Sequence, residues 1–109
     1  FPIWWSAEPA ILKGFIDRTF TPRFAYRFAD GKSEPKLTGK TAALILTCRA
    51  PAFFYRLYGG PITRWKRMVL GFVGIRLTDT FILGKIDYPQ DTPEYRAEFV
   101  ESIRRYARR

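Results

Sequence analysis

The sequence has no histidine and only one cysteine, Cys48, among its 109 residues. Without histidine, Ser-His-Asp and Cys-His catalysis is excluded, and so are histidine-ligated metal sites. A single cysteine cannot form a disulfide within the chain, so the cysteine content does not indicate secretion. Asp87, Asp91 and Glu94 are spaced as in the entry to a helix, which is more typical of capping than of metal binding. We therefore expect no metal site.

Long apolar runs are also missing. Arg49, Pro51 and Arg56 interrupt the most apolar region, so no stretch reaches the ~18 apolar residues of a membrane-spanning helix. The first residues lack the basic head that precedes the apolar stretch of a signal peptide. The expected location is the cytoplasm. Because the chain begins with Phe1 rather than Met, we expect a fragment or a processed product.

Acidic residues are absent from Pro35 to Thr78, which makes the charge uneven. The chain has 19 basic and 10 acidic residues and a net charge of +9. The basic residues inside the acid-free window are Lys36, Lys40, Arg49, Arg56, Arg64, Lys66, Arg67 and Arg76. A positive surface attracts the phosphates of nucleic acids, dinucleotides or anionic membranes. A solvated basic face without any ligand is an equally good interpretation.

The remaining composition is that of a globular protein, with 47% hydrophobic and 17% aromatic residues. The length allows one domain, residues 1–109. Helical spacing and start signals predict three helices, which begin near Pro9, at Pro61 and after Thr92. In the first helix one apolar face is expected to hold Ile11, Leu12, Phe15, Ile16 and Phe20.

Continuous apolar runs predict the strands. Residues 41–48 read as a strand covered on both faces, and residues 77–83 read as a second strand. The apolar segment Phe1–Trp5 indicates the end of another strand, and residues 49–60 indicate an aromatic loop. Strands alternating with helices predict an α/β fold with an open parallel sheet and right-handed crossovers.

Two aromatic loops leave the carboxyl ends of these strands, Pro2–Glu8 and Thr47–Gly60. Ligands of open parallel sheets bind outside those ends. The pair of loops therefore suits a flat heteroaromatic ligand, although a core role is the more ordinary interpretation of any single aromatic residue in them.

Several motifs match one family. Phe1-Pro2-Ile3-Trp4-Trp5 is followed by Pro9-Ala10-Ile11-Leu12-Lys13-Gly14-Phe15-Ile16-Asp17-Arg18. This arrangement resembles the NAD(P)H:quinone oxidoreductases of the flavodoxin-like superfamily. Further similarity lies at Phe24-Ala25-Tyr26, at 37–40, at 54–59 and at 71–75. The resemblance implies a flavodoxin-like three-layer α/β/α fold with a parallel sheet, represented by its last three βα units. The N-terminal strand and the phosphate-binding loop would then precede Phe1, which would leave one incomplete domain.

The resemblance also implies an activity. The protein would be a flavin-dependent NAD(P)H oxidoreductase that passes a hydride from NAD(P)H, through FMN or FAD, to a quinone or similar acceptor. A homodimer is expected. The implied flavin-binding residues are Pro2, Ile3, Trp4, Trp5, Ser6, Thr47, Cys48, Arg49 and Ala50. Tyr55 would donate a hydrogen bond as negative charge develops on the reduced flavin. The implied acceptor pocket contains Trp5, Tyr26 and Phe28, the last two in some members across a dimer interface.

Three positions depart from the family pattern. Thr47-Cys48-Arg49-Ala50 stands where relatives often have Thr-Thr-Gly-Gly, so a cation replaces a glycine beside the expected ring. Pro61 stands where some relatives have a histidine after the tyrosine, which excludes a tyrosine–histidine proton relay. Ser6 replaces a common aromatic residue, which widens the expected acceptor pocket.

Two other functions remain open. A flavodoxin-like regulatory subunit could use the basic face to dock on a membrane potassium-efflux system. A basic nucleic-acid-binding module could stack bases on Trp, Tyr and Arg side chains. Because the basic residues are spread over loops and helices and no nucleic-acid motif is present, we expect no nucleic-acid partner.

Overall fold

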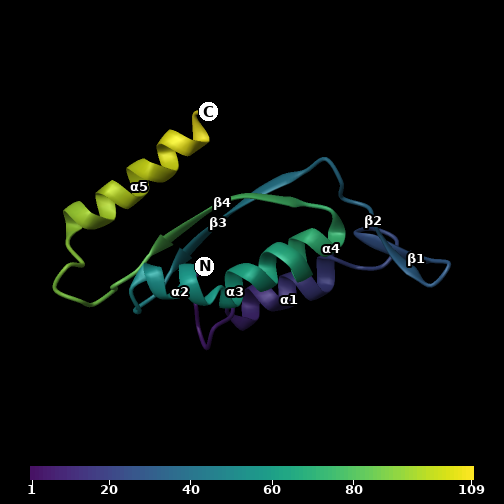
Figure 1. Cartoon of the computed structure of the whole chain (residues 1–109), viewed down its shortest axis with the longest axis horizontal. Helices are drawn as coiled ribbons and strands as arrows, with labels where there is room; N and C mark the ends of the chain where they lie inside the picture. The colour runs from purple at the N-terminus through teal and green to yellow at the C-terminus, as the bar shows by residue number, and fades with distance from the viewer.

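Two parallel strands, β3 (Thr41–Thr47) and β4 (Arg76–Leu83), form the centre of the fold. The computed structural model describes residues 1–109 (Figure 1). Residues 1–3 extend the sheet on the other side of β3, where the Ile3 amide donates to the Thr47 carbonyl at 2.8 Å. The Thr47 amide donates in turn to the Phe1 carbonyl at 3.1 Å. The chain therefore crosses the sheet in the order 1–3, β3, β4.

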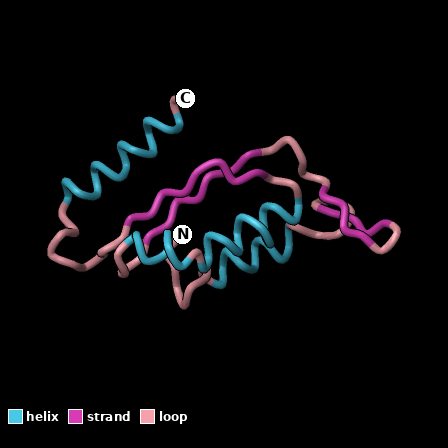
Figure 2. The backbone as a smooth tube through the Cα atoms, in the orientation of Figure 1, coloured by secondary structure: helices cyan, strands magenta, loops and turns pink.

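Helices lie on both sides of this sheet. Helix α1 (Ala10–Thr19) and the helical stretch α3 (Gly60–Arg64), η1 (Trp65–Leu70) and α4 (Gly71–Val73) lie together on one side (Figures 1 and 2). Helix α5 (Pro93–Ala107) lies on the other side, where the ring centroids of Tyr106 and Phe81 are 5.3 Å apart. The predicted α/β class and parallel sheet are confirmed.

The core lies between the sheet and the first of these helical layers. Leu44, Leu46 and Cys48 alternate along the chain, so the three side chains turn to the same face of β3. The buried residues that complete this cluster are Ile3, Trp65, Val69, Leu70 and Ile82. Burying such apolar side chains supplies the main free energy that fixes both helices on the sheet.

A hairpin lies at the opposite end of the sheet from the carboxyl ends of β3 and β4 (Figure 1). Its antiparallel strands are β1 (Tyr26–Ala29) and β2 (Lys32–Pro35). The ring of Tyr26 lies 5.1 Å from that of Phe72, and the Leu37 amide donates to the Val73 carbonyl at 2.9 Å. These contacts attach the hairpin to the end of α4.

Three local expectations were wrong. Part of the predicted loop 49–60 is a helix, α2 (Ala52–Tyr58), which begins after Pro51 because proline lacks the N–H that a helix start leaves unpaired. The apolar strand β3 is fully covered on one face only, because α5 on the other face contacts β4 and leaves Ile45 44% exposed. Helix α1 turns Ile11 and Phe15 to solvent, and its contacts with the core come from Leu12, Ile16 and Phe20.

The helical stretch that begins at Gly60 ends at Val73, and Gly74 follows it in the left-handed conformation with φ of 92°. The stretch passes through a π-helical turn, in which the Gly71 amide donates to the carbonyl of Lys66, five residues earlier. The start of the last helix is as predicted, since the Thr92 hydroxyl accepts from the Tyr95 amide at 3.1 Å. No helix has both the length and the apolar character needed to traverse a lipid bilayer.

Candidate functional site

A hollow of about 220 Å³ lies at the carboxyl edge of the sheet, between the end of segment 1–3 and the end of β3. We call it the edge hollow. Its lining residues are Pro2, Ile3, Trp4, Thr47, Cys48, Arg49 and Ile86. Six of these seven are among the nine residues that the sequence predicted to bind a flavin. Parallel pairing of Pro2 with Thr47 brings the two loops together, because both strands end at this edge.

A tight turn carries the chain away from the edge hollow. The amides and carbonyls of Trp4 and Ala7 exchange two hydrogen bonds, of 2.9 and 3.0 Å. Between them Trp5 and Ser6 have φ of 51° and 60°, the left-handed conformation of a type I′ turn. Non-glycine residues adopt it at a cost of about 1–2 kcal/mol each. The turn leaves the Trp5 side chain 99% exposed at the rim.

The second loop is held by the chain that follows β4. The Cys48 amide donates to the Leu83 carbonyl at 2.9 Å, and the Lys85 amide donates to the Ala50 carbonyl at 3.1 Å. A further bond of 3.3 Å runs from the Ile86 amide to the Cys48 carbonyl. Residues 48–50 are therefore fixed by backbone contacts on the side away from segment 1–3.

Free hydrogen-bond donors are present in both loops. The backbone amides of Trp5, Ser6, Arg49 and Ala50 donate to no acceptor within the chain. Arg49 is exposed and forms no ion pair. This set of N–H groups and one cation suits a planar ligand whose edge carries carbonyl oxygens and ring nitrogens.

Cys48 is buried at the base of the hollow, and its thiol donates to the Ala50 carbonyl with a sulfur–oxygen distance of 3.2 Å. Burial raises the pKa of the Cys48 thiol. The group is therefore neutral at physiological pH and is a poor nucleophile, because the thiolate is the reactive form. Its position favours packing over covalent chemistry.

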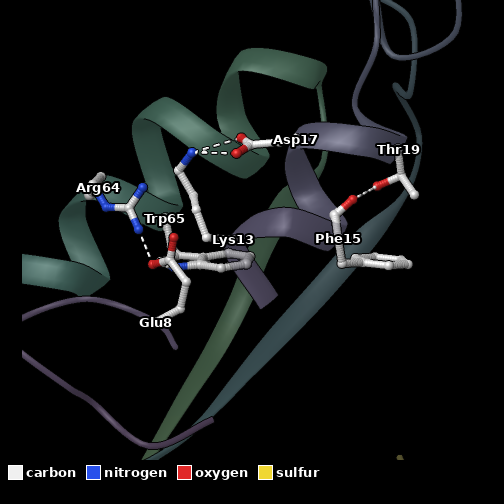
Figure 3. Close-up of polar contacts among 7 residues, drawn as sticks. All are labelled: Glu8, Lys13, Phe15, Asp17, Thr19, Arg64 and Trp65. Atoms are coloured by element: carbon white, nitrogen blue, oxygen red, sulfur yellow. Dashed lines mark hydrogen bonds and ion pairs between the residues drawn. The ribbon is translucent and has the colours of Figure 1, made fainter. Parts of the chain in front are cut away.

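A buried carboxylate lies directly behind the turn. The Glu8 carboxylate accepts from the Arg64 guanidinium and, at 3.0 Å, from the indole Nε1 of Trp65 (Figure 3). Burial by itself raises the pKa of Glu8, but the hydrogen bonds from Arg64, from its own backbone and from Trp65 outweigh that effect. The pKa of Glu8 consequently lies below its usual value, and the group is charged at neutral pH.

Tyr55 lies outside the edge hollow. It is half-buried on α2 and lines a separate hollow of about 300 Å³ with Arg56, Gly59, Ile62, Thr63, Lys66 and Thr80. No carboxylate lines this second hollow. Tyr55 therefore does not line the edge hollow, although it packs against the core cluster that contains Ile3 and Cys48.

The predicted acceptor pocket is also divided within one chain. Trp5 stands at the carboxyl edge of the sheet, whereas Tyr26 and Phe28 lie on the hairpin at the opposite end (Figure 1). Their two rings contact each other edge to face, with centroids 5.6 Å apart, and Phe28 is exposed. Ser6 is exposed on the Trp4–Ala7 turn, and Ala50 is half-buried beside the edge hollow.

Three residues that position the site were not expected from the sequence. Ile86 lines the edge hollow, and Glu8 and Trp65 meet behind the turn. The one local signal was an acidic residue in an otherwise apolar entry to a helix, at Glu8. No local pattern predicts its partner 57 residues later in the chain.

Known proteins with a similar sequence or fold place the chain in a family. A crystal structure of Smu.1420 from Streptococcus mutans UA159 is 33% identical, with a TM-score of 0.79 over 99% of this chain and 56% of that one. A ribosyldihydronicotinamide dehydrogenase-like protein, traD, of Penicillium crustosum is 42% identical over 72 residues, which cover 57% of this chain and 27% of the relative.

An uncharacterized NAD(P)H oxidoreductase of Escherichia coli K12, YcaK, is 29% identical over 104 residues, covering 94% of this chain and 50% of the relative. The chain spans half or less of the length of these two curated relatives. The family described as having a flavodoxin-like fold matches residues 1–107. This match confirms the family resemblance drawn from the motifs, and the chain belongs to the flavodoxin-like fold family.

Proposed function

We propose that the protein is a flavin-dependent NAD(P)H oxidoreductase that reduces a quinone or a similar acceptor. The observation that carries this proposal is the edge hollow. Two loops predicted to hold a flavin, around Pro2–Trp4 and Thr47–Arg49, line one cavity at the carboxyl edge of a parallel sheet. The names of the relatives, an NAD(P)H oxidoreductase and a ribosyldihydronicotinamide dehydrogenase-like protein, support the same reaction class.

The residues of the hollow and of the two loops beside it fit a flavin in their chemistry. The free amides of Trp5, Ser6, Arg49 and Ala50 would donate to the oxygens and nitrogens along the polar edge of the ring. The Arg49 guanidinium would compensate negative charge on that edge in the reduced state. The flavin, either FMN or FAD, supplies the capacity to accept a hydride from NAD(P)H and to give up two electrons. Cys48 and Ile3 supply the buried apolar floor.

Four aromatic residues complete the proposal. The fully exposed Trp5 ring would provide one wall for the nicotinamide and the acceptor, which use the site in turn. Tyr55 would donate a hydrogen bond as charge develops, the role that the family resemblance implies. Tyr26 and Phe28 lie at the end of the sheet opposite the edge hollow of their own chain. They would therefore contact an acceptor only in a homodimer, where that acceptor is bound at the edge hollow of the second copy.

An absorption spectrum of the complete protein that the gene encodes tests this function. We expect the visible absorption bands of a protein-bound flavin, either after purification or after addition of FMN or FAD. NADPH or NADH should bleach the bands, and a quinone should restore them. A folded protein that stays colourless with both flavins would refute the proposal. If neither NADPH nor NADH bleaches the bands, the protein binds a flavin but the proposed NAD(P)H oxidoreductase activity is refuted.

A further inference from the structure

Glu8 and Asp91 are the two acidic residues whose side chains are almost fully buried within an ion pair, at 2% and 4% exposed. By contrast, the Asp17 side chain is 57% exposed in its ion pair within α1. Figure 3 shows Glu8 pointing from the chain segment before α1 toward the helical layer that holds Arg64 and Trp65. A buried charge is tolerated only where it is paired and hydrogen-bonded, and both partners here meet one oxygen, Oε2.

The partners belong to a part of the helix with irregular geometry. Arg64 is the last residue of α3, and Trp65 is the first residue of the π-helical turn η1. Short π-helical turns occur frequently at functional sites. The Trp65 indole is buried and also packs against the Phe1 ring, with centroids 5.2 Å apart. Trp65 therefore contacts the chain on both sides of the Trp4–Ala7 turn.

The turn itself needs such support. Trp5 and Ser6 both adopt the left-handed conformation that glycine and asparagine favour, so local sequence does not stabilise the turn. Residues in disfavoured backbone conformations persist when the surrounding structure over-determines them. At its start the turn is fixed by Ile3, which is buried and bonded to Thr47. At its end the corresponding contact is the Glu8 side chain.

We propose that Glu8 is a positioning residue that holds the Trp4–Ala7 turn in its left-handed conformation by anchoring the end of the turn to Trp65 and Arg64. Through this turn, Glu8 sets the affinity of the edge hollow for flavin. The second statement rests on the proposed function, whereas the first concerns the chain alone. No step of the chemistry is assigned to Glu8, because it does not line the edge hollow.

Three substitutions in the complete protein separate the contributions. Glu8→Leu removes both bonds. Trp65→Phe keeps a ring in the core but removes the N–H donor, so it tests one bond with a smaller loss of packing than truncation to alanine would cause. Glu8→Gln keeps an acceptor for Trp65 and removes the charge. Asp17→Asn is the matched control, because it removes a neighbouring carboxylate whose hydrogen bonds stay within α1.

Hydrogen exchange of backbone amides reads the turn without any flavin. The Ala7 amide, bonded to Trp4, is expected to exchange at least about tenfold faster in Glu8→Leu and about threefold faster in Trp65→Phe. Glu8→Gln should fall between Glu8→Leu and the unchanged protein, and Asp17→Asn should change nothing. The Leu46 amide in the core strand should keep its rate in Trp65→Phe. If Glu8→Leu does not fold, Trp65→Phe and Glu8→Gln decide.

An unchanged Ala7 rate in every folded variant would overturn the proposal. An equal acceleration of Ala7 and Leu46 would also overturn it, since it would indicate a general loss of stability rather than release of the turn. FMN and FAD titrations then test the second statement, with a dissociation constant raised in parallel with the Ala7 exchange rate. Unaltered flavin affinity in a variant with a released turn would refute that statement. If the unsubstituted protein binds neither flavin, the proposed function fails and the exchange data alone decide the role of Glu8.

Discussion

The backbone of Gly84 lies so close to Ala52 that a Cβ atom on Gly84 would stand 2.5 Å from the Ala52 amide nitrogen. The same atom would lie 2.7 Å from the Ala50 carbonyl oxygen. Only glycine permits this approach, through which the chain after β4 presses against the loop that ends at Ala50. The position of that side of the edge hollow thus depends on a residue without a side chain.

Gly84→Ala should therefore both destabilise the protein and disturb the hollow. We expect a loss of about 1–3 kcal/mol of unfolding free energy, because backbone rather than a flexible side chain must move. Flavin affinity should fall as well. Chemical denaturation and a flavin titration measure the two effects. Gly14→Ala is the control, since a Cβ there meets nothing within 4 Å inside α1 and should raise stability by about 0.5–1 kcal/mol. Equal outcomes for the two variants would contradict the close-packing argument.

Ser6→Gly should stabilise the fold. Ser6 has φ of 60°, where glycine avoids a steric cost that other residues bear. We expect the unfolding free energy to rise by up to about 1 kcal/mol, less the entropy that glycine loses on folding. Ser102→Gly, in the interior of α5, should instead lower it by a similar amount. A lower denaturation midpoint for Ser6→Gly would show that the turn carries no strain at this residue.

Asp91 should contribute to acid sensitivity. Hydrogen bonds from the Arg96 guanidinium, at 2.6 Å to each carboxylate oxygen, and from the Asp87 amide lower the pKa of Asp91 to about 2. A carboxyl whose pKa falls on folding stabilises the folded state above its ordinary pKa of 3.8, and this contribution disappears as the pH falls toward about 2.

Denaturation midpoints over this pH range test the expectation. Asp91→Asn should be less stable than the unsubstituted protein at neutral pH, and the difference should shrink progressively below pH 3.8. Asp17→Asn, which removes an exposed i,i+4 pair, should cost no more than about 0.5 kcal/mol at neutral pH. A difference for Asp91→Asn that is independent of pH would contradict the assignment.

Tyr55→Phe tests the hydrogen-bonding role proposed for Tyr55. Loss of a hydrogen-bond donor to developing charge should lower kcat by about 10²-fold while flavin affinity is kept. Tyr58→Phe is the matched control on the same helix, where the exposed Tyr58 ring stacks on Phe54. Steady-state kinetics with NADPH and a quinone would measure both variants. Equal kcat values would remove Tyr55 from the mechanism, in keeping with its place in a separate hollow.

The arrangement of the edge hollow could be predicted because it depends on short motifs and one topological rule. Pro2 and Thr47 end adjacent parallel strands, and the rule brings such ends to one edge. The start of α5 could be predicted because Thr92 caps it through a contact three residues away. In these cases the sequence separation is short, or the sheet itself makes the connection.

Other features depend on contacts that no local pattern contains. Glu8 and Trp65 are 57 residues apart, and their bond follows from how α1 and η1 share one face of the sheet. The exposure of Ile11 and Phe15 was missed because the apolar face of α1 is wider than the core surface that α1 contacts. The residues at one side of this face therefore remain exposed. Helix α2 was missed because aromatic residues have moderate helix propensity, and tertiary contacts of Tyr55 and Ala52 decide its conformation.

Pro2 determines which hydrogen-bonding groups segment 1–3 presents on the side that faces away from β3. In this parallel pairing, Phe1 and Ile3 direct their bonding groups toward β3, so those of Pro2 face away. Proline offers a carbonyl there but no N–H. A further strand laid along this side could donate to Pro2 but would find no donor in return. At Pro2 the edge of the sheet therefore offers a hydrogen-bond acceptor and no donor. Another strand can pair there only in a register that needs no donor at this position, which disfavours pairing with an identical copy of segment 1–3.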